Sequence, residues 1–140
     1  MFDNIPTLTL SRRFKADWDA VSTALACAQE FIARAPCGAD AEAKLAIILE
    51  ELVANVVEHG SAGPESEILI DIVAIGQDIG LTLGDGGSHF DPRTAPAPQD
   101  VPPERGGGAG LALVRRWANI VSYDRINGRN LLRLVIPHNG

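Results

Sequence analysis

The sequence is poor in the features that mark secreted or membrane-bound proteins. It contains only two cysteines, Cys27 and Cys37, and no pattern of metal-ligand spacing joins them. The N-terminal residues lack the apolar core of a secretory signal. No apolar run approaches the ~18 residues that a membrane-spanning helix requires. We therefore expect reduced thiols, a cytoplasmic location and no membrane partner.

Basic residues are also scarce. Twelve Lys and Arg residues stand against 18 Asp and Glu residues, giving a formal net charge of −6, and no run of adjacent basic residues is longer than a pair, as at Arg115-Arg116. Nucleic-acid backbones are held mainly by clustered Lys and Arg, so we expect no direct nucleic-acid binding. A nucleotide ligand is not excluded, because backbone N–H groups and a metal ion can hold its few phosphates.

Length and composition are those of one globular domain. The chain has 140 residues, 46% of them hydrophobic, which is enough to bury one core. We expect a single domain over residues 1–140. Apolar periodicity and turn residues predict, in order, a strand at 7–11, helices at 15–35 and 40–59, strands at 68–75 and 79–84, a helix at 111–119, and strands at 120–126 and 131–136.

This order of elements predicts an α+β fold. Strands and helices are partly segregated, which favours a two-layer sandwich: a mixed, mostly antiparallel sheet with helices on one face. Tight turns are expected at residues 76–78 and at Asn127-Gly128. The first helix is expected to begin at Asp17, its N-cap, and to bury an apolar stripe of Trp18, Val21, Leu25, Ala28 and Ile32.

Residues 86–108 differ from the rest of the chain. They hold five of the nine prolines and five of the 14 glycines. A loop this long inside a compact domain is usually functional, so we predict a mobile functional loop here.

A first group of candidate functional residues lies on the second helix. Glu51, Asn55 and His59 follow one another at intervals of four, along the border of the predicted buried stripe. A carboxylate and an amide one turn apart can reach the same small polar cavity. The alternative is a solvated helix edge, although Asn is a mediocre helix former in such a position. The buried stripe itself is predicted at Leu45, Leu49, Leu52 and Val56.

A second candidate is Asp85, at the end of a predicted strand and followed by Gly86 and Gly87. Glycines let backbone or ligand approach the carboxylate closely. Such a carboxylate can accept a hydrogen bond from an exocyclic amine, which would select a base such as adenine. The alternative is an ordinary Asp-Gly turn.

A third candidate is the glycine series Gly106, Gly108 and Gly110, just before the third predicted helix. Backbone N–H groups and a helix N-terminus can converge there on phosphate. A flexible linker would also explain the glycines, but not why they end where a helix begins. The loop does not open a first strand–helix unit, and it lacks the Lys-Ser/Thr pair of a phosphate loop, so neither common nucleotide motif applies.

Taken in order, these motifs resemble the GHKL ATPases, which include gyrase, histidine kinases and the MutL repair proteins. The resemblance runs over residues 8–136 and is closest to the single-domain anti-sigma-factor serine kinases, which have the Bergerat ATP-binding fold. The motifs that carry it are Glu51-x-x-x-Asn55, Asp85-x-Gly87 with Phe90-Asp91-Pro92, and Gly106-x-Gly108-x-Gly110-Leu111.

The resemblance implies a role for each motif. Asn55 would coordinate Mg²⁺ together with ATP phosphates, and Asp85 would recognise the adenine amine. Glu51 would be the general base, and Arg105 would reach the γ-phosphate from the end of an ATP lid at residues 88–108. His59 is expected to be structural. Further nucleotide contacts are implied for Gly87, Phe90, Gly106, Gly108, Ala109, Gly110 and Leu111.

The resemblance further implies a serine/threonine-protein kinase that switches an anti-sigma-type circuit by phosphorylating a small antagonist protein. A sigma factor or secretion regulator would be another partner, and a homodimer is expected. The alternative is an ATP-binding module that sequesters its partner without catalysis. A sensor histidine kinase is disfavoured because no histidine stands in a phospho-accepting context, and a topoisomerase or chaperone fragment because no coupling domain is present.

Overall fold

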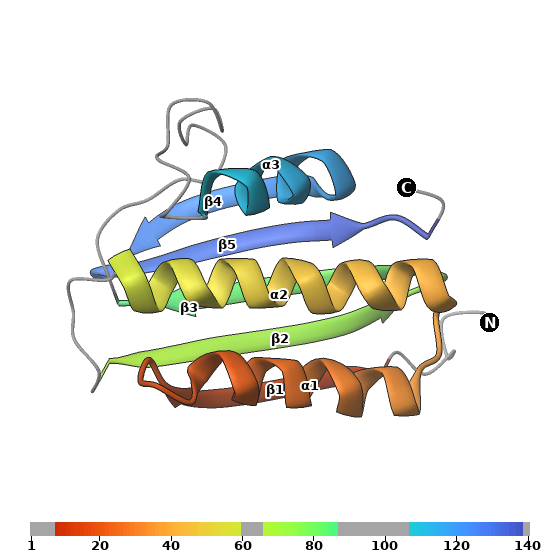
Figure 1. The fold of residues 1–140 in the computed structure, drawn as a ribbon, viewed down its shortest axis with the longest axis horizontal. Helices are drawn as coiled ribbons and strands as arrows, with labels where there is room; N and C mark the ends of the chain where they lie inside the picture. Colours follow the sequence, from red (N-terminus) through yellow and green to blue (C-terminus); the bar gives the residue numbers. More distant parts are fainter. Residues whose placement is uncertain (1–7, 60–65, 87–106, 139–140) are drawn as a thin grey trace.

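The computed structural model describes residues 8–59, 66–86 and 107–138. Its five strands form one sheet in the order β1-β2-β3-β5-β4, and every pairing is antiparallel. The α+β prediction is confirmed, with a fully antiparallel sheet among the described strands rather than a mixed one. The elements are β1 (Thr9–Lys15), α1 (Ala20–Arg34), α2 (Ala39–His59), β2 (Glu67–Ile75), β3 (Asp78–Asp85), α3 (Gly107–Trp117), β4 (Asn119–Ile126) and β5 (Arg129–Ile136) (Figure 1).

Both predicted tight turns are present. Asn127 and Gly128 join β4 to β5 with φ angles of 53° and 78°. Positive φ at both central residues is what a two-residue hairpin with the twist of the flanking strands requires. The turn between β2 and β3 contains Gly76, whose φ is 61°. These turns fix the register of the two hairpins, and through it the face on which each strand residue lies.

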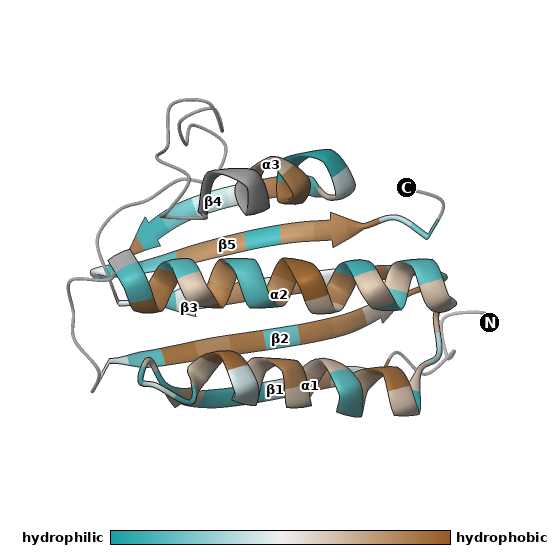
Figure 2. Cartoon of the chain, in the orientation of Figure 1, coloured by the Kyte–Doolittle hydropathy of each residue, from teal (hydrophilic) through white to brown (hydrophobic). Residues whose placement is uncertain are grey.

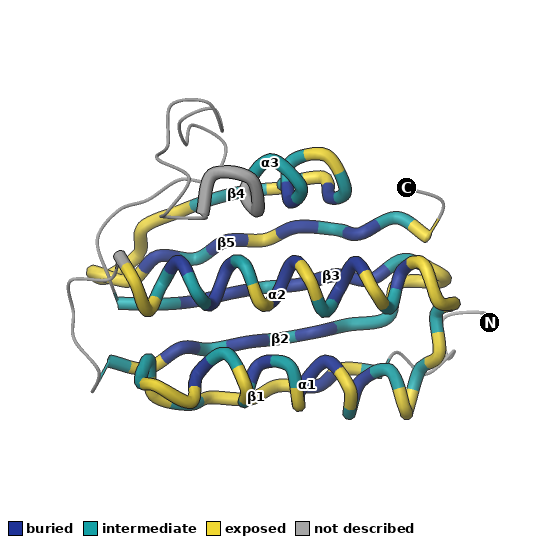
Figure 3. The backbone as a smooth tube through the Cα atoms, in the orientation of Figure 1, coloured by how far each residue is buried: buried dark blue, intermediate teal, exposed yellow. Residues whose placement is uncertain are grey.

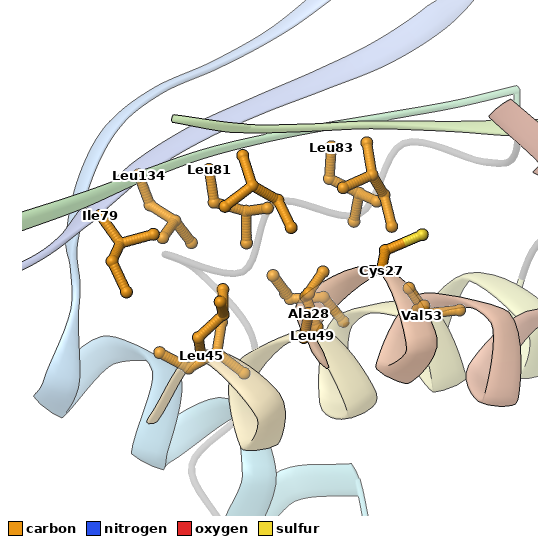
Figure 4. Close-up of a cluster of buried hydrophobic side chains, with 14 of the residues drawn as sticks. Cys27, Ala28, Leu45, Leu49, Val53, Ile79, Leu81, Leu83 and Leu134 are labelled. Carbon is orange, nitrogen blue, oxygen red and sulfur yellow. The ribbon is translucent and has the colours of Figure 1, made fainter. Parts of the chain in front are cut away.

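The three helices cover one face of the sheet (Figure 1). The core forms between them, and the brown apolar segments of α2 and the central strands run along it (Figure 2). Leu45 and Leu49 of α2 are fully buried against Leu81 and Leu134 of the sheet (Figure 4). Burial alternates along β5, as expected for a strand with one face in the core (Figure 3). The stripe predicted on α2 is confirmed for Leu45, Leu49 and Leu52, while Val56 is partly buried against the core.

The predicted buried stripe of α1 is mostly wrong, since Ala28 is its one residue that is buried. Trp18 precedes the helix and is 98% exposed, while Val21 and Ile32 lie only partly buried at the border of the core. Small side chains on its buried face let α1 approach its neighbours closely. Because protein interiors are close-packed, this close approach leaves little room for larger side chains on that face. The buried face consists of Ala20, Ala24, Cys27, Ala28 and Phe31.

The boundaries around α1 also differ from the prediction. Asp17 is not the N-cap; its carboxylate accepts a hydrogen bond from the backbone N–H of Asp19 at 3.0 Å, and the helix begins at Ala20. Strand β1 continues to Lys15 because it pairs with β2 along its whole length. Charged residues such as Arg12 are tolerated there because β1 is an edge strand. None of the described helices is long and apolar enough to cross a membrane.

Candidate functional site

The predicted site residues come from elements whose ends gather at one end of the molecule. The C-terminal end of α2, the end of β3, the start of β5 and the N-terminal end of α3 lie together at the left of Figure 1. Glu51 and Asn55 belong to α2, and Asp85 closes β3. The fold therefore brings residues far apart in sequence toward one region.

Asn55 is the most unusual residue of this region. It is only 6% exposed, and its Nδ2 atom has no hydrogen-bond partner within the described part of the chain. A buried polar group without a partner costs about 1–3 kcal/mol, and such exceptions in folded proteins call for an explanation. A ligand that satisfies the amide would supply one.

The chemistry of Asn55 fits the magnesium role that the resemblance implies. Rotation of the amide by half a turn exchanges its nitrogen and oxygen, so the residue can present an oxygen at the unpartnered position. Magnesium prefers oxygen ligands and is usually held by one or two protein groups together with substrate phosphates. A single buried amide of this kind is therefore an adequate protein contribution to a magnesium–nucleotide site.

Glu51 lies one helical turn before Asn55 and is half-buried. Burial raises the pKa of its carboxyl above the usual value, and the neighbouring carboxylates of Glu50 and Glu58 raise this pKa further. A raised pKa makes a carboxylate a stronger proton acceptor at neutral pH. Glu51 thus has the character of a general base beside a candidate metal ligand.

Asp85 is held by a buried partner on the adjacent strand. Asn130 of β5 lies opposite Asp85 in the register of β3 and β5, and its Nδ2 donates a hydrogen bond to Asp85 Oδ1 at 3.0 Å. Asn130 is 2% exposed. Its Oδ1 accepts a hydrogen bond from Arg125 Nη1 of β4 at 2.8 Å. Three strands thus contribute to the orientation of one carboxylate.

Asn130 and Arg125 were missed in the sequence. The signal was available for Asn130, because Leu132, Leu134 and Ile136 alternate toward the core and Asn130 continues that alternation. A polar residue at an inward position is informative. Arg125 gave no signal, since its link to Asn130 depends on the pairing of β4 with β5.

Helix α3 begins at Gly107, earlier than the predicted residue 111. Gly108, Ala109 and Gly110 therefore belong to its first turn rather than to a preceding loop, and Leu111 follows them in the helix. The first N–H groups of a helix have no partner within it, so a helix start at these glycines still offers donors to phosphate. The other end of α3 is anchored, since Val114 is fully buried and Lys44 Nζ of α2 lies 5.7 Å from the ring centroid of Trp117.

Several predicted residues lie outside the described part of the chain. Gly87, Phe90, Arg105 and Gly106 are among them, together with residues 88–106 of the predicted lid. Residues 107 and 108 of that lid fall within α3. The backbone of His59 closes α2, but its side chain is also outside the description.

Comparison with known families identifies the family to which the chain belongs. Residues 14–136 match the model of the histidine kinase-like ATPase domain. The chain belongs to this family. The GHKL resemblance drawn from the three motifs is thereby confirmed, and ATP binding by a kinase-like ATPase domain follows at the level of the family.

Two known proteins are similar to this histidine kinase-like ATPase domain. It is 29% identical over 94 residues to the serine/threonine-protein kinase BtrW of Bordetella bronchiseptica, a match that covers 64% of this chain and 66% of that protein. The structure of the RsbU and RsbW domains of Rv1364c from Mycobacterium tuberculosis has the same fold, with a TM-score of 0.65 at 21% identity. That match covers 94% of this chain and 32% of the other.

A third likeness, to the histidine kinase AdeS of Acinetobacter baumannii, has a TM-score of 0.48 at 15% identity and supports no inference about function.

The chain spans just under two thirds of the length of the kinase BtrW and about a third of the length of the Rv1364c structure.

Proposed function

We propose that this protein is an ATP-dependent serine kinase that works as an anti-sigma-type switch in the cytoplasm. The observation that carries the proposal is the pairing, one helical turn apart, of a half-buried carboxylate of raised pKa with a buried amide that has no partner in the described chain. In a histidine kinase-like ATPase domain these are the groups that phosphoryl transfer requires: a base and a metal-holding residue.

Binding is assigned to residues of three elements. Asn55 would hold Mg²⁺ through its amide oxygen, and Asp85 would accept a hydrogen bond from the adenine amine. Backbone N–H groups at Gly108 and Gly110 would hold the phosphates at the start of α3. When bound, ATP would supply the phosphoryl group and Mg²⁺ would neutralise the charge that develops during transfer. Residues 88–106, the part of the predicted lid that precedes α3, are proposed to close over the nucleotide, with Arg105 near their end.

Catalysis is assigned to Glu51. Its carboxylate would take the proton from the hydroxyl of a partner's serine as the seryl oxygen bonds to the γ-phosphorus and the bond to ADP breaks. A base that is already a strong proton acceptor at neutral pH suits this step. The serine is proposed to lie on a small antagonist protein, and a sigma factor or secretion regulator is proposed as the partner that the switch controls. We also propose that the kinase acts as a homodimer.

The kinase proposal is tested by incubating the purified protein with radiolabelled ATP, Mg²⁺ and cytoplasmic extract of its source. We expect one small protein to be labelled on serine. The Glu51→Gln variant should lose roughly a hundredfold or more in rate, as expected for removal of a general base. Glu50→Gln is the matched control, because Glu50 is the adjacent, exposed carboxylate. Equal labelling by Glu51→Gln and the wild type would remove Glu51 as the base.

The role of Asn55 is tested by the affinity for Mg-ATP, measured by calorimetry. Asn55→Ala should abolish binding while circular dichroism shows an intact fold. Asn119→Ala, at an exposed position of β4, is the control and should bind as the wild type does. Unchanged affinity in Asn55→Ala would contradict the assignment. If the wild type binds Mg-ATP tightly but labels no protein, the chain is a sequestering module and not a kinase.

A further inference from the structure

The hydrogen bonds around Asn130 have only one consistent direction. An arginine side chain can donate but cannot accept, so the Asn130 atom that faces Arg125 Nη1 at 2.8 Å must be the oxygen. The amide nitrogen then faces Asp85 Oδ1 at 3.0 Å, where it donates to the carboxylate. Arg125 thereby excludes the opposite orientation of the amide, which would turn an oxygen toward the oxygen of Asp85.

The burial of Asn130 makes this arrangement rigid. The residue is 2% exposed, so water has little access to replace either bond. Hydrogen bonds that involve a charged partner are shorter and stronger than neutral ones. The two hydrogen bonds of Asn130 each have a charged partner, the Asp85 carboxylate and the Arg125 guanidinium. One oxygen of Asp85 is therefore fixed, and the plane of its carboxylate with it.

We propose that Asn130 is a positioning residue that sets the base selectivity of the nucleotide site, with Arg125 holding its amide in the required orientation. The inference rests on the proposed function, in which Asp85 reads the base. A fixed carboxylate accepts a hydrogen bond from the exocyclic amine of a 6-aminopurine. It repels the oxo group that a 6-oxopurine carries at the same place. The site therefore takes adenine nucleotides and rejects hypoxanthine and guanine nucleotides.

Asn130→Asp is the most direct substitution, because it keeps the size of the side chain and replaces the amide donor with a charged acceptor. The new carboxylate can still accept from Arg125, but it places a second acidic group within hydrogen-bond distance of Asp85. Two carboxylates this close repel each other unless they share a proton. Either outcome moves or protonates the group that reads the amine, so discrimination between the two purine classes should fall.

The measurement is the dissociation constant of Mg-ATP and of Mg-ITP, which has an oxo group in place of the 6-amino group. A site built to hydrogen-bond the amine of its substrate rejects an analogue that lacks this amine. We therefore expect the wild type to bind ATP more tightly than ITP by about a hundredfold or more. Asn130→Asp should reduce this ratio by about tenfold or more. Asn119→Asp makes the same chemical change at an exposed position and should leave the ratio unchanged.

Arg125→Leu is the second variant, and it changes a residue of the edge strand β4 that is exposed overall. It removes the donor that holds the amide oxygen of Asn130 and should also lower the ATP-to-ITP ratio, while Arg125→Lys, which keeps a donor, should restore part of it. If Asn130→Asp does not fold, the ATP-to-ITP ratios of Arg125→Leu and Arg125→Lys test the proposal instead. A purely structural role would weaken ATP and ITP binding equally and leave the ratio unchanged.

The two possible failures are distinguishable. If the wild type binds ATP and prefers it over ITP, but the ratio survives in Asn130→Asp and in Arg125→Leu, the positioning role of Asn130 is wrong and the proposed function stands. If the wild type binds neither nucleotide, or binds both equally, the assignment of Asp85 is overturned and this inference falls with it.

Discussion

The hydrogen-bond partners of buried polar side chains distinguish structural residues from candidate ligand-binding residues. Lys44, Asn55 and Asn130 are the buried polar residues of the described chain. Lys44 is satisfied by an ion pair with Asp40 at 3.0 Å and by the ring of Trp117, and Asn130 by its two strand neighbours. Only Asn55 retains an unpartnered atom among these three. A buried polar atom without a hydrogen-bond partner destabilises the fold, so its presence favours a ligand-binding role for Asn55.

The raised pKa of Glu51 predicts a specific pH dependence of stability. Because this pKa lies above that of the unfolded chain, the folded protein binds the proton more tightly than the unfolded one does. The contribution to stability is full below the ordinary value of 4.5 and is lost as pH rises through the raised pKa. At neutral pH the ionised Glu51 therefore destabilises the fold, an effect that its partial exposure reduces.

Glu51→Gln should accordingly raise the melting temperature at pH 7 by about 1–2 °C. The gain should disappear near pH 4, where the wild-type carboxyl is protonated. Thermal unfolding of both proteins across this range checks the prediction, with Asp124→Asn, at an exposed position of β4, as the control. A gain of the same size at both pH values would show that the effect does not come from the ionisation of Glu51.

At this scale the sequence predicted the residues that lie within one motif and missed those that meet through strand pairing. Glu51 and Asn55 share a helix, so their spacing alone places them on one line. Asp85 stands out through the glycines that follow it. Asn130 and Arg125 acquire meaning only once β3, β5 and β4 are aligned. That alignment depends on long-range pairing, which local patterns do not specify.

At the scale of elements, β3 has two glycines on the face of the sheet that none of the described helices covers, and they differ in the space around them. A Cβ added at Gly80 would lie 2.7 Å from Val73 Cγ1 and 2.8 Å from Ile75 Cδ1. A Cβ at Gly84 would meet its nearest atom, Leu69 Cβ, at 3.5 Å, an ordinary contact. Val73 is branched at Cβ and cannot easily turn away.

We therefore expect Gly80→Ala to destabilise the protein by about 1–3 kcal/mol, the usual cost of overpacking. Gly84→Ala should change stability by less than about 1 kcal/mol, because the lost flexibility of the unfolded chain offsets any small strain. Urea unfolding of the two variants beside the wild type gives both values. Equal effects at the two positions would show that the close approach of Val73 to Gly80 does not limit the packing of this strand.

The accuracy of the predicted elements follows how strongly each one is amphipathic. Helix α2 has large apolar residues on one face, and its burial was predicted correctly. Helix α1 buries mainly alanines, so its larger residues gave the wrong orientation. The hairpins were found because Gly76 and Asn127-Gly128 suit only tight turns. The start of α3 was misplaced because a run of glycines is a poor signal for a helix.

At the scale of the whole molecule, the proposed nucleotide would join α2, β3 and α3. A ligand that binds only the folded state stabilises it by mass action, by about 2.7 kcal/mol at a concentration a hundred times its dissociation constant. For a domain of this size that corresponds to a rise in melting temperature of roughly 5–11 °C. We expect this rise with ATP and Mg²⁺ together, measured by differential scanning fluorimetry.

Removal of Mg²⁺ with a chelator should abolish most of the rise, as should Asn55→Ala. Asn119→Ala should retain it. A full rise in the presence of the chelator would mean that the phosphates are held without the metal, and the role given to Asn55 would have to be abandoned.

The pairing of β1 with β2 has a consequence for how the chain assembles. Leu10 lies opposite Ile72, with both α1 and α2 between them in sequence, whereas the hairpins β2–β3 and β4–β5 close over two residues each. Pairings between distant segments close large loops and form slowly, so the hairpins should form before β1 docks. Until it does, β2 is an unprotected edge, able to recruit the same strand of another molecule. The yield of refolded protein should therefore fall as its concentration rises.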